Sequence, residues 1–316
     1  METFLIMLKN VIIFVLLAVP GFLLVKGKVL KPQESNVLSK ILTNLGMPAL
    51  IFANTISLDL SGEFLKSLFV VVALCVVFHV LSYFVFGLMC RGEKDKRAMM
   101  RFCIMFSNSG FIGIPLVSAV FPGNVNILAY VTLANIIMNI TMFTLGIYML
   151  TGDKSAINVR KAILSPVLLS FLAGVAVNLL GAVKAVPEIA TYVNHLKGVV
   201  TPISMIVLGM KLAEVPLKRL FSCGQMYYVS FLRLVAYPVI ATATILLLRL
   251  IPGMPVGADC VVGFFVGVGM PTASLSSAFA DRFGGDADSA VIFTLGTTLF
   301  SVLTIPVLYW LLEMFI

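Results

Sequence analysis

The sequence predicts an all-α integral membrane protein, and both its composition and the length of its apolar runs support this fold class. Of the 316 residues, 60% are hydrophobic and 11% are charged, whereas soluble domains carry about 25% charged residues. The mean hydropathy is +1.09. Apolar runs of about 20 residues, the length that crosses a bilayer, follow one another along the chain. This composition leaves little of the chain for a soluble domain.

Ten apolar segments reach or approach the length of a membrane-spanning helix. In chain order we expect them at 4–25, 38–57, 65–89, 99–121, 127–150, 163–183, 198–212, 221–248, 258–280 and 290–312. Residues 1–150 then form a first five-helix repeat and residues 151–316 a second. The seventh segment is the least defined, because it is short and contains Pro202 and Gly209. The first carries Lys9 and lacks a small-x-small cleavage site, so it resembles a spanning helix more than a signal peptide.

Lys and Arg are distributed unequally between the loops, and this asymmetry predicts the orientation, because cytoplasmic loops carry an excess of positive charge. With the N-terminus outside, the outer side carries Lys9, Lys66, Lys184, Lys197 and Arg249. The other loop cations then fall on the cytoplasmic side. We therefore expect a multi-pass protein of the cytoplasmic (inner) cell membrane with both termini outside. The net charge of +8 is explained by this topology, and no nucleic-acid partner is expected.

Two apolar segments are interrupted in the middle by Gly, Pro, Asn and Ser. The fourth contains residues 107–116 (SNSGFIGIPL) and the ninth contains residues 268–277 (VGMPTASLSS). Backbone that is broken at membrane depth is tolerated only where it is buried in protein or lines a cavity. Breaks in corresponding positions of two halves point to the binding site of a secondary transporter. For either break alone, a packing kink is the alternative.

The two halves of the chain correspond in an ordered series of positions. Pro48 in the second segment matches Pro202 in the seventh, and the same spacing pairs His79 with Arg233. The two breaks also correspond. Because five is an odd number of helices, the second half enters the membrane inverted, an arrangement common among transporters with a midplane site.

The fourth-segment motif resembles the fourth-helix signature of the auxin efflux carrier family, which includes the plant PIN carriers and many bacterial proteins. Residues 44–52 (NLGMPALIF), 201–213 (TPISMIVLGMKLA) and 270–279 fit the same family, so the resemblance covers essentially the whole chain. The absence of a long loop between segments five and six is similar to the compact bacterial members. The resemblance implies ten transmembrane helices in two inverted five-helix repeats, in which the broken helices four and nine cross.

The same resemblance implies that the helices form two parts with different roles. Helices one, two, six and seven would form a scaffold that dimerises, and helices three to five and eight to ten a mobile transport domain. In PIN carriers an Asn at the fourth-helix break helps to hold the substrate carboxylate, and the resemblance places Asn108 there. Pro271 is retained, but Ser107 stands where the plant proteins have Pro and Thr272 where they have Gln. The expected substrate is therefore the broader class of small organic anions.

The residue types at the breaks suit anion binding, because the start of a half-helix exposes unpaired N–H groups and the positive end of the helix dipole. The expected substrate-binding residues are Asn108, Ser109, Gly110, Pro271, Thr272, Ser274, Asn135 and Asn139. The expected crossover or hinge residues are Ser107, Gly113, Pro115, Gly267 and Gly269. Pro271 suits a half-helix start, because proline has no N–H to lose there. Asn135 and Asn139 share a helix face and either line the path or bond between helices.

Arg233 is a cation deep inside a segment, where insertion costs about 2.5–3.5 kcal/mol, so it should face a cavity or a partner. Two roles are open for it: counter-charge to an anionic substrate, or a structural role such as bonding carbonyls at a helix break, which we favour. His79, its repeat mate, either titrates as a gate or is simply hydrogen-bonded.

No H-E-x-x-H or G-x-S-x-G motif is present, so the chain is not expected to be an enzyme. We predict a carrier that moves a small organic anion, a carboxylate, by elevator-type alternating access as a homodimer in the lipid bilayer. A channel-like anion pore and a non-transport intramembrane protein are the alternatives. No cofactor or metal is expected, and Na⁺ coupling, H⁺ coupling and uniport stay open.

Overall fold

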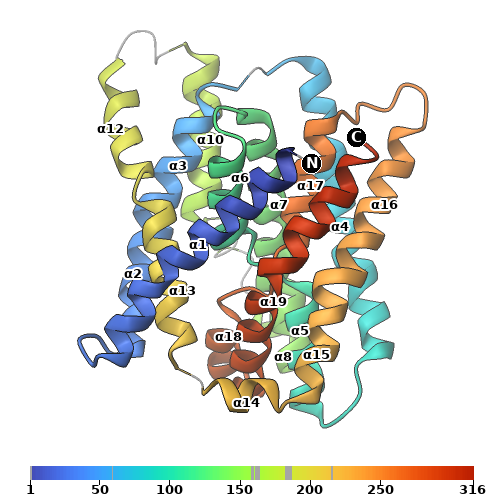
Figure 1. Ribbon diagram of the computed structural model, residues 1–316. Helices are drawn as coiled ribbons and strands as arrows, with labels where there is room; N and C mark the ends of the chain where they lie inside the picture. Colours follow the sequence, from blue (N-terminus) through green and yellow to red (C-terminus); the bar gives the residue numbers. More distant parts are fainter. Residues whose placement is uncertain (1, 59, 158–159, 161–163, 182–186, 215) are drawn as a thin grey trace.

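The computed structural model is a bundle of helices and, in the part of the chain that it describes (residues 2–58, 60–157, 160, 164–181, 187–214 and 216–316), it contains no strand (Figure 1). Within those residues, seven stretches are long and apolar enough to cross a membrane: Leu5–Lys26, Pro32–Thr55, Gly62–Met89, Val125–Thr151, Ala190–Leu212, Gly224–Arg249 and Ala287–Glu313. Three shorter apolar helices accompany them: Ser109–Val120, Pro166–Leu179 and Ala258–Gly269. The predicted all-α membrane class is confirmed.

The helices of the first half divide into long rods and interrupted ones. In order they are α1 (Glu2–Lys26), η1 (Pro32–Glu34), α2 (Ser35–Ile41), η2 (Leu42–Gly46), α3 (Met47–Thr55), α4 (Gly62–Met89), α5 (Lys94–Met105), η3 (Ser109–Gly113), α6 (Ile114–Val120), α7 (Val125–Thr141), η4 (Met142–Gly146), α8 (Ile147–Thr151) and η5 (Lys154–Ala156). The elements η2, η3 and η4 are single π turns that run directly into the next α-helix. Such turns occur often at functional sites.

The second half follows the same pattern. Its elements are α10 (Pro166–Leu179), α12 (Pro187–Lys197), α13 (Val200–Leu212), α14 (Leu217–Phe221), α15 (Gly224–Phe231), η6 (Leu232–Ala236), α16 (Tyr237–Arg249), α17 (Ala258–Gly269), α18 (Ser276–Phe283) and α19 (Ala287–Glu313). The π turn η6 joins α15 to α16, so these two form one long helix. Both chain ends lie at the same end of the bundle (Figure 1).

Several helices start where a polar side chain satisfies a free N–H group of the first turn. Ser61 accepts from the Phe64 N–H at the start of α4, and Asn124 accepts from the Ile127 N–H at 3.1 Å at the start of α7. Asp286 does the same at the start of α19. These residues lie in the polar stretches between apolar runs, which explains why the observed boundaries fall close to the predicted ones.

The seventh predicted segment, 198–212, is too short. The helix continues toward the N-terminus through α12, and Ala190–Leu212 is long enough to span a membrane. The sequence hides this extension because Glu188, His195 and Lys197 lower its hydropathy. The two ends of the predicted sixth segment, 163 and 183, lie outside the described residues, and the helix within it is α10.

Helices α1 and α13 approach each other closely. A Cβ placed on Gly209 would collide with the Ala18 carbonyl, and one on Gly21 would collide with the Ile206 carbonyl. Glycine at these positions lets the two backbones touch, as small residues do where membrane helices pack. Elsewhere α3 packs against α10 and α12, while α17 packs against α7 and α16.

Candidate functional site

Two helices stop in the middle of the bundle and resume after a short extended stretch. Helix α5 ends at Met105, and Phe106 is extended (φ −101°, ψ 121°). Helix α17 ends at Gly269, and Met270 is extended (φ −72°, ψ 158°). The first break begins one residue before the predicted motif at 107–116, and the second lies within the predicted motif at 268–277.

The two extended stretches pair with each other. Ser107 and Thr272 form an isolated antiparallel bridge. The Asn108 N–H donates to the Pro271 carbonyl at 2.7 Å, and the Ala273 N–H donates to the Phe106 carbonyl at 2.9 Å. Backbone groups that each break frees are therefore satisfied by the other break, as buried peptide groups require.

Side chains reinforce this pairing in a reciprocal way. The Ser107 hydroxyl donates to the Gly267 carbonyl at 2.8 Å, in the last turn of α17. The Thr272 hydroxyl donates to the Cys103 carbonyl at 2.7 Å, in the last turn of α5. Each break thus supplies a hydroxyl that caps the helix preceding the other break.

Arg233, in η6, also donates hydrogen bonds to carbonyls at the ends of the same two helices. Its side chain is fully buried, and its guanidinium donates to the carbonyls of Met270 and Ile104 at 2.8 Å each, and of Met105 at 3.4 Å and Val268. In the described part of the chain no carboxylate lies within ion-pair distance of it. Of the two roles open from the sequence, these contacts are those of the structural one.

Pro271 lies in the extended stretch and not at a half-helix start as predicted, because α18 begins five positions later, at Ser276. The restricted φ of proline also suits extended backbone, and the carbonyl of Pro271 serves the pairing of the two breaks. The half-helix that follows the first break begins at once, with η3 at Ser109. Its first N–H groups have no acceptor within the helix.

A small cavity of about 80 Å³ lies beside the paired breaks. It is lined by Thr43, Met47, Ser107, Asn108, Gly110, Phe111, Asn135, Met138, Asn139, Met142, Val167, Ala273, Ser274 and Leu275. Amide and hydroxyl groups supply its polar surface, and no acidic residue lines it. The cavity therefore offers hydrogen-bond donors without a negative charge.

Two short hydrogen-bond chains fix the polar groups of the cavity. The Asn108 amide donates to the Ser274 hydroxyl at 2.6 Å, joining the first break to the second. The Asn139 amide donates to the Asn135 side-chain oxygen at 3.0 Å, and the Asn135 amide donates to the Ser109 hydroxyl at 3.0 Å. Helix α7 therefore presents its two Asn side chains to the first break, as their spacing of four residues predicts.

The remaining predicted site residues surround the breaks without lining the cavity. Thr272 is completely buried, and its N–H donates to the Thr297 hydroxyl of α19 at 3.1 Å. His79 on α4 stacks on the Phe106 ring at 5.9 Å, and its Nδ1 lies 2.6 Å from the Cys75 carbonyl. Thr272 therefore bonds to α19, and His79 packs on a side chain of the first break, but neither residue lines the cavity.

The predicted hinge glycines lie where neighbouring side chains pack closely against the interrupted helices. A Cβ on Gly267 would collide with Ala134 of α7, and one on Gly113 would lie 3.1 Å from the Met270 side chain. A Cβ on Gly269 would lie 3.3 Å from the Phe265 ring. Pro115, in the first turn of α6, is buried. These residues let the interrupted helices approach each other and α7.

Lys211 is a residue near the site that sequence reasoning assigned to a cytoplasmic loop. It stands in the last turn of α13, and its Nζ donates to the Ser274 carbonyl at 2.9 Å. Burial raises the pKa of Glu214, just beyond the helix, and the nearby Lys211 opposes this shift. The sequence signal was weak, because a lysine at the end of an apolar run resembles any loop cation.

Comparison with known proteins agrees with this geometry. The model of the membrane transport protein family matches residues 5–309. An uncharacterized transporter of Methanothermobacter thermautotrophicus is 28% identical over 94% of both chains. An uncharacterized transporter of Methanocaldococcus jannaschii is 24% identical over 96% of this chain and 97% of its own. The chain therefore belongs to the membrane transport protein family, the family of the auxin efflux carriers that its motifs resemble, and it is a membrane transporter and not an enzyme.

Proposed function

We propose that this transporter is a carrier for a small organic anion, a carboxylate, and that the cavity beside the paired breaks is its binding site. The observation that carries the proposal is the cavity lining, in which the amides of Asn108, Asn135 and Asn139 meet at the start of a half-helix with no acidic residue among them. Amide N–H groups and a helix N-terminus both favour an anion over a cation.

Lys211 strengthens the preference for an anion. It bonds a carbonyl of Ser274, whose hydroxyl accepts from Asn108, so a positive charge lies next to a residue of the cavity wall. In the described residues the lysine forms no ion pair. A carboxylate in the cavity would gain from this charge, because partly buried charges are screened less than exposed ones.

The packing suits an elevator-type movement in a protein of ten transmembrane helices arranged as two inverted repeats. Helices α1, α2, α3, α10, α12 and α13 pack on one another, and the interrupted helices pack on α7 and α19. The first group contributes three residues to the cavity wall: Thr43, Met47 and Val167. The site thus lies between the two groups, where a sliding movement would expose it to either side, and the first group would supply the dimer contact.

The breaks are poorly suited to binding sodium. Carbonyls at the ends of α5 and α17 accept from Arg233, Thr272 and Ser107, so Na⁺ would have to displace protein donors to reach them. We therefore propose that transport does not use sodium at this position. A flux that saturates with substrate would separate this carrier from the alternative of an anion pore.

The first test is thermal unfolding of the purified protein with a panel of carboxylic acids, with and without sodium. We expect at least one acid to raise the melting temperature in a saturable way, and the rise to disappear in Asn108→Ala. Asn10→Ala is the matched control, because Asn10 is an exposed amide on α1 that bonds its own helix. A rise that survives in Asn108→Ala would move the site elsewhere. No rise with any acid would leave the breaks as structural kinks.

A further inference from the structure

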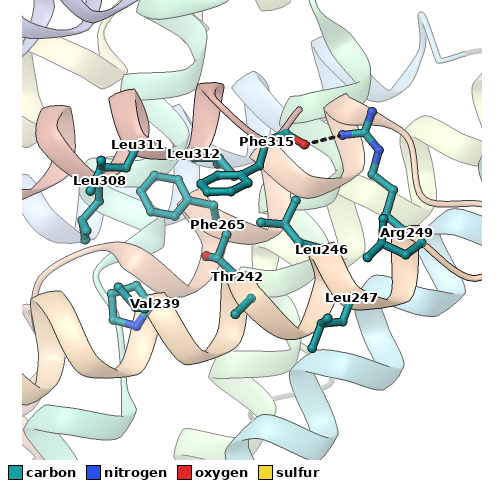
Figure 2. Close-up of a pocket in the computed structure, with 13 residues that line it drawn as sticks. Val239, Thr242, Leu246, Leu247, Arg249, Phe265, Leu308, Leu311, Leu312 and Phe315 are labelled. Carbon is teal, nitrogen blue, oxygen red and sulfur yellow. Dashed lines mark hydrogen bonds between the residues drawn. The ribbon is translucent and has the colours of Figure 1, made fainter.

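A second cavity, a groove of about 810 Å³, lies between α16, α17 and α19. Figure 2 shows Leu308 and Leu311 of α19 at one end of it, Phe265 of α17 in the middle and Arg249 of α16 at the other end. Nearly every side chain that lines it is aliphatic or aromatic. The groove shares no lining residue with the cavity at the breaks.

The groove is open toward the outside of the bundle. Leu247, Leu250 and Phe315, which line it, are 65%, 77% and 68% exposed. In a protein of this composition, side chains of this kind face lipid and not water. A long aliphatic chain is therefore the occupant whose chemistry matches the walls of the groove.

Arg249 gives one end of the groove a positive charge. It is the last residue of α16, and its guanidinium donates to the Phe315 carbonyl at 3.5 Å (Figure 2). It also donates to a backbone oxygen of Ile316, the last residue of the sequence, at 3.2 Å. The guanidinium carries five N–H donors, and among the described residues no Asp or Glu side chain forms an ion pair with it. Donors therefore remain for an anionic group, and the planar fork of arginine matches a phosphate, as it does a carboxylate.

The buried hydroxyl of Thr242 is a second, independent observation that points to a ligand in the groove. It lies in the middle of the groove, seven residues before Arg249 and so about two turns along the same face of α16 (Figure 2). Only 8% of the residue is exposed, and its hydroxyl oxygen has no hydrogen-bond partner in the described structure. Buried hydroxyls are normally paired. An ester or ether oxygen of a lipid in the groove would be a suitable acceptor.

We propose that this groove binds one phospholipid with a net negative headgroup, whose phosphate is held by Arg249 and whose chains lie along α16 and α19. A zwitterionic headgroup would place an ammonium near the guanidinium and lose part of the attraction. On the predicted topology Arg249 lies in the outer leaflet. The alternative is that Arg249 only complements the C-terminal end of the α16 dipole.

The test is lipid retention, measured by native mass spectrometry on protein stripped of lipid and then supplied with equal amounts of phosphatidylglycerol and phosphatidylcholine of the same chains. We expect the protein to retain phosphatidylglycerol preferentially. Arg249→Gln should lower this preference by about tenfold, the size of one charge-assisted hydrogen bond. Lys66→Gln is the matched control, because Lys66 is an exposed cation on the same predicted side, and it should leave the preference unchanged.

A second pair of variants tests the position of the chains. Ala243 lines the groove, so Ala243→Trp should fill it and reduce retention of both lipids. Val85→Trp, at an exposed position of α4 that does not line the groove, should reduce neither. Inorganic phosphate should not compete, because it lacks the chains.

Three results would overturn the proposal. The first is an unchanged lipid preference in Arg249→Gln, and the second is an equal loss of both lipids together with a lower melting temperature. The latter would assign Arg249 to packing alone. The third is full retention in Ala243→Trp, which would place the lipid elsewhere. None of these results bears on the carboxylate site, whose test uses different residues and a different ligand.

Discussion

Replacing Arg233 by Met should strongly destabilise the protein, because this one side chain ties the ends of two interrupted helices together. The guanidinium makes four hydrogen bonds, to the carbonyls of Ile104, Met105, Val268 and Met270. Methionine fills most of the volume but offers no donor. The variant therefore leaves these carbonyls without the partner that burial requires.

The magnitude follows from two opposing effects. A hydrogen bond to a charged group contributes about 1.5–3 kcal/mol, so four of them sum to about 6–12 kcal/mol. Against this, removing a fully buried charge recovers a desolvation penalty of several kcal/mol. We expect a net loss of about 3–5 kcal/mol, the usual cost of removing one partner from a buried charged network. Arg233→Lys should lose less, although one ammonium cannot reach both helix ends.

The assay is thermal unfolding followed with a thiol-reactive dye. Cys103 is completely buried in the last turn of α5, so its labelling reports opening at the break itself. Peptide mass spectrometry separates this labelling from that of the other free cysteines, of which Cys223 is only half-buried. We expect Arg233→Met to melt at a lower temperature and to label Cys103 faster below the main transition. Arg91→Met, at an exposed loop position, is the matched control and should change neither. An Arg233→Met protein with unchanged melting and labelling, but without the rise in melting temperature caused by a carboxylic acid, would refute this reasoning. It would make Arg233 the counter-charge of the substrate.

Three further outcomes are expected. Lys211→Met should weaken carboxylate affinity by about tenfold while Lys211→Arg keeps most of it, since the charge beside Ser274 is what matters; equal affinities in a titration would contradict this. Gly209→Leu should destabilise the protein by about 1–3 kcal/mol, because its side chain meets the backbone of α1; Gly224→Ala, which meets nothing, is the control for the melting curve. Burial raises the pKa of Asp286, but hydrogen bonds from Ser289 outweigh it, so the folded pKa is lowered. Asp286 therefore stabilises the fold at neutral pH, and the difference in melting temperature between the protein and Asp286→Ala should shrink as the pH falls through that pKa; a difference independent of pH would contradict this.

The spanning helices could be predicted because their signal is local. A run such as α4 or α19 is apolar over most of its length, and that length indicates a spanning helix. The predicted start of the seventh segment was wrong because α12 carries charged residues. Glu188 and Lys197 made this helix resemble a loop in the sequence. The breaks in α5 and α17 were also predictable, because Gly, Pro, Asn and Ser gather there within apolar runs.

The pairing of the two breaks could not be predicted from local sequence patterns. That Thr272 bonds Cys103, and Ser107 bonds Gly267, depends on contacts between residues more than a hundred positions apart. Pro271 was expected at a helix start, and the direction of the pairing places it in the extended stretch. From the sequence, the position of Arg233 inside an apolar segment indicated only that it needs hydrogen-bond partners. It did not indicate whether these partners are carbonyls or a substrate.

These contacts give a physical reason why the site should prefer anions. Each end of a helix carries roughly half a charge, negative at the C-terminus and positive at the N-terminus. The C-terminal ends of α5 and α17 meet at Arg233, whose single positive charge is about equal to the two negative halves. The positive end of η3 and α6 has no such compensation among the residues that line the cavity, and Lys211 adds to it. Arg233 thus cancels the negative helix ends, and we expect the field that remains in the cavity to be positive.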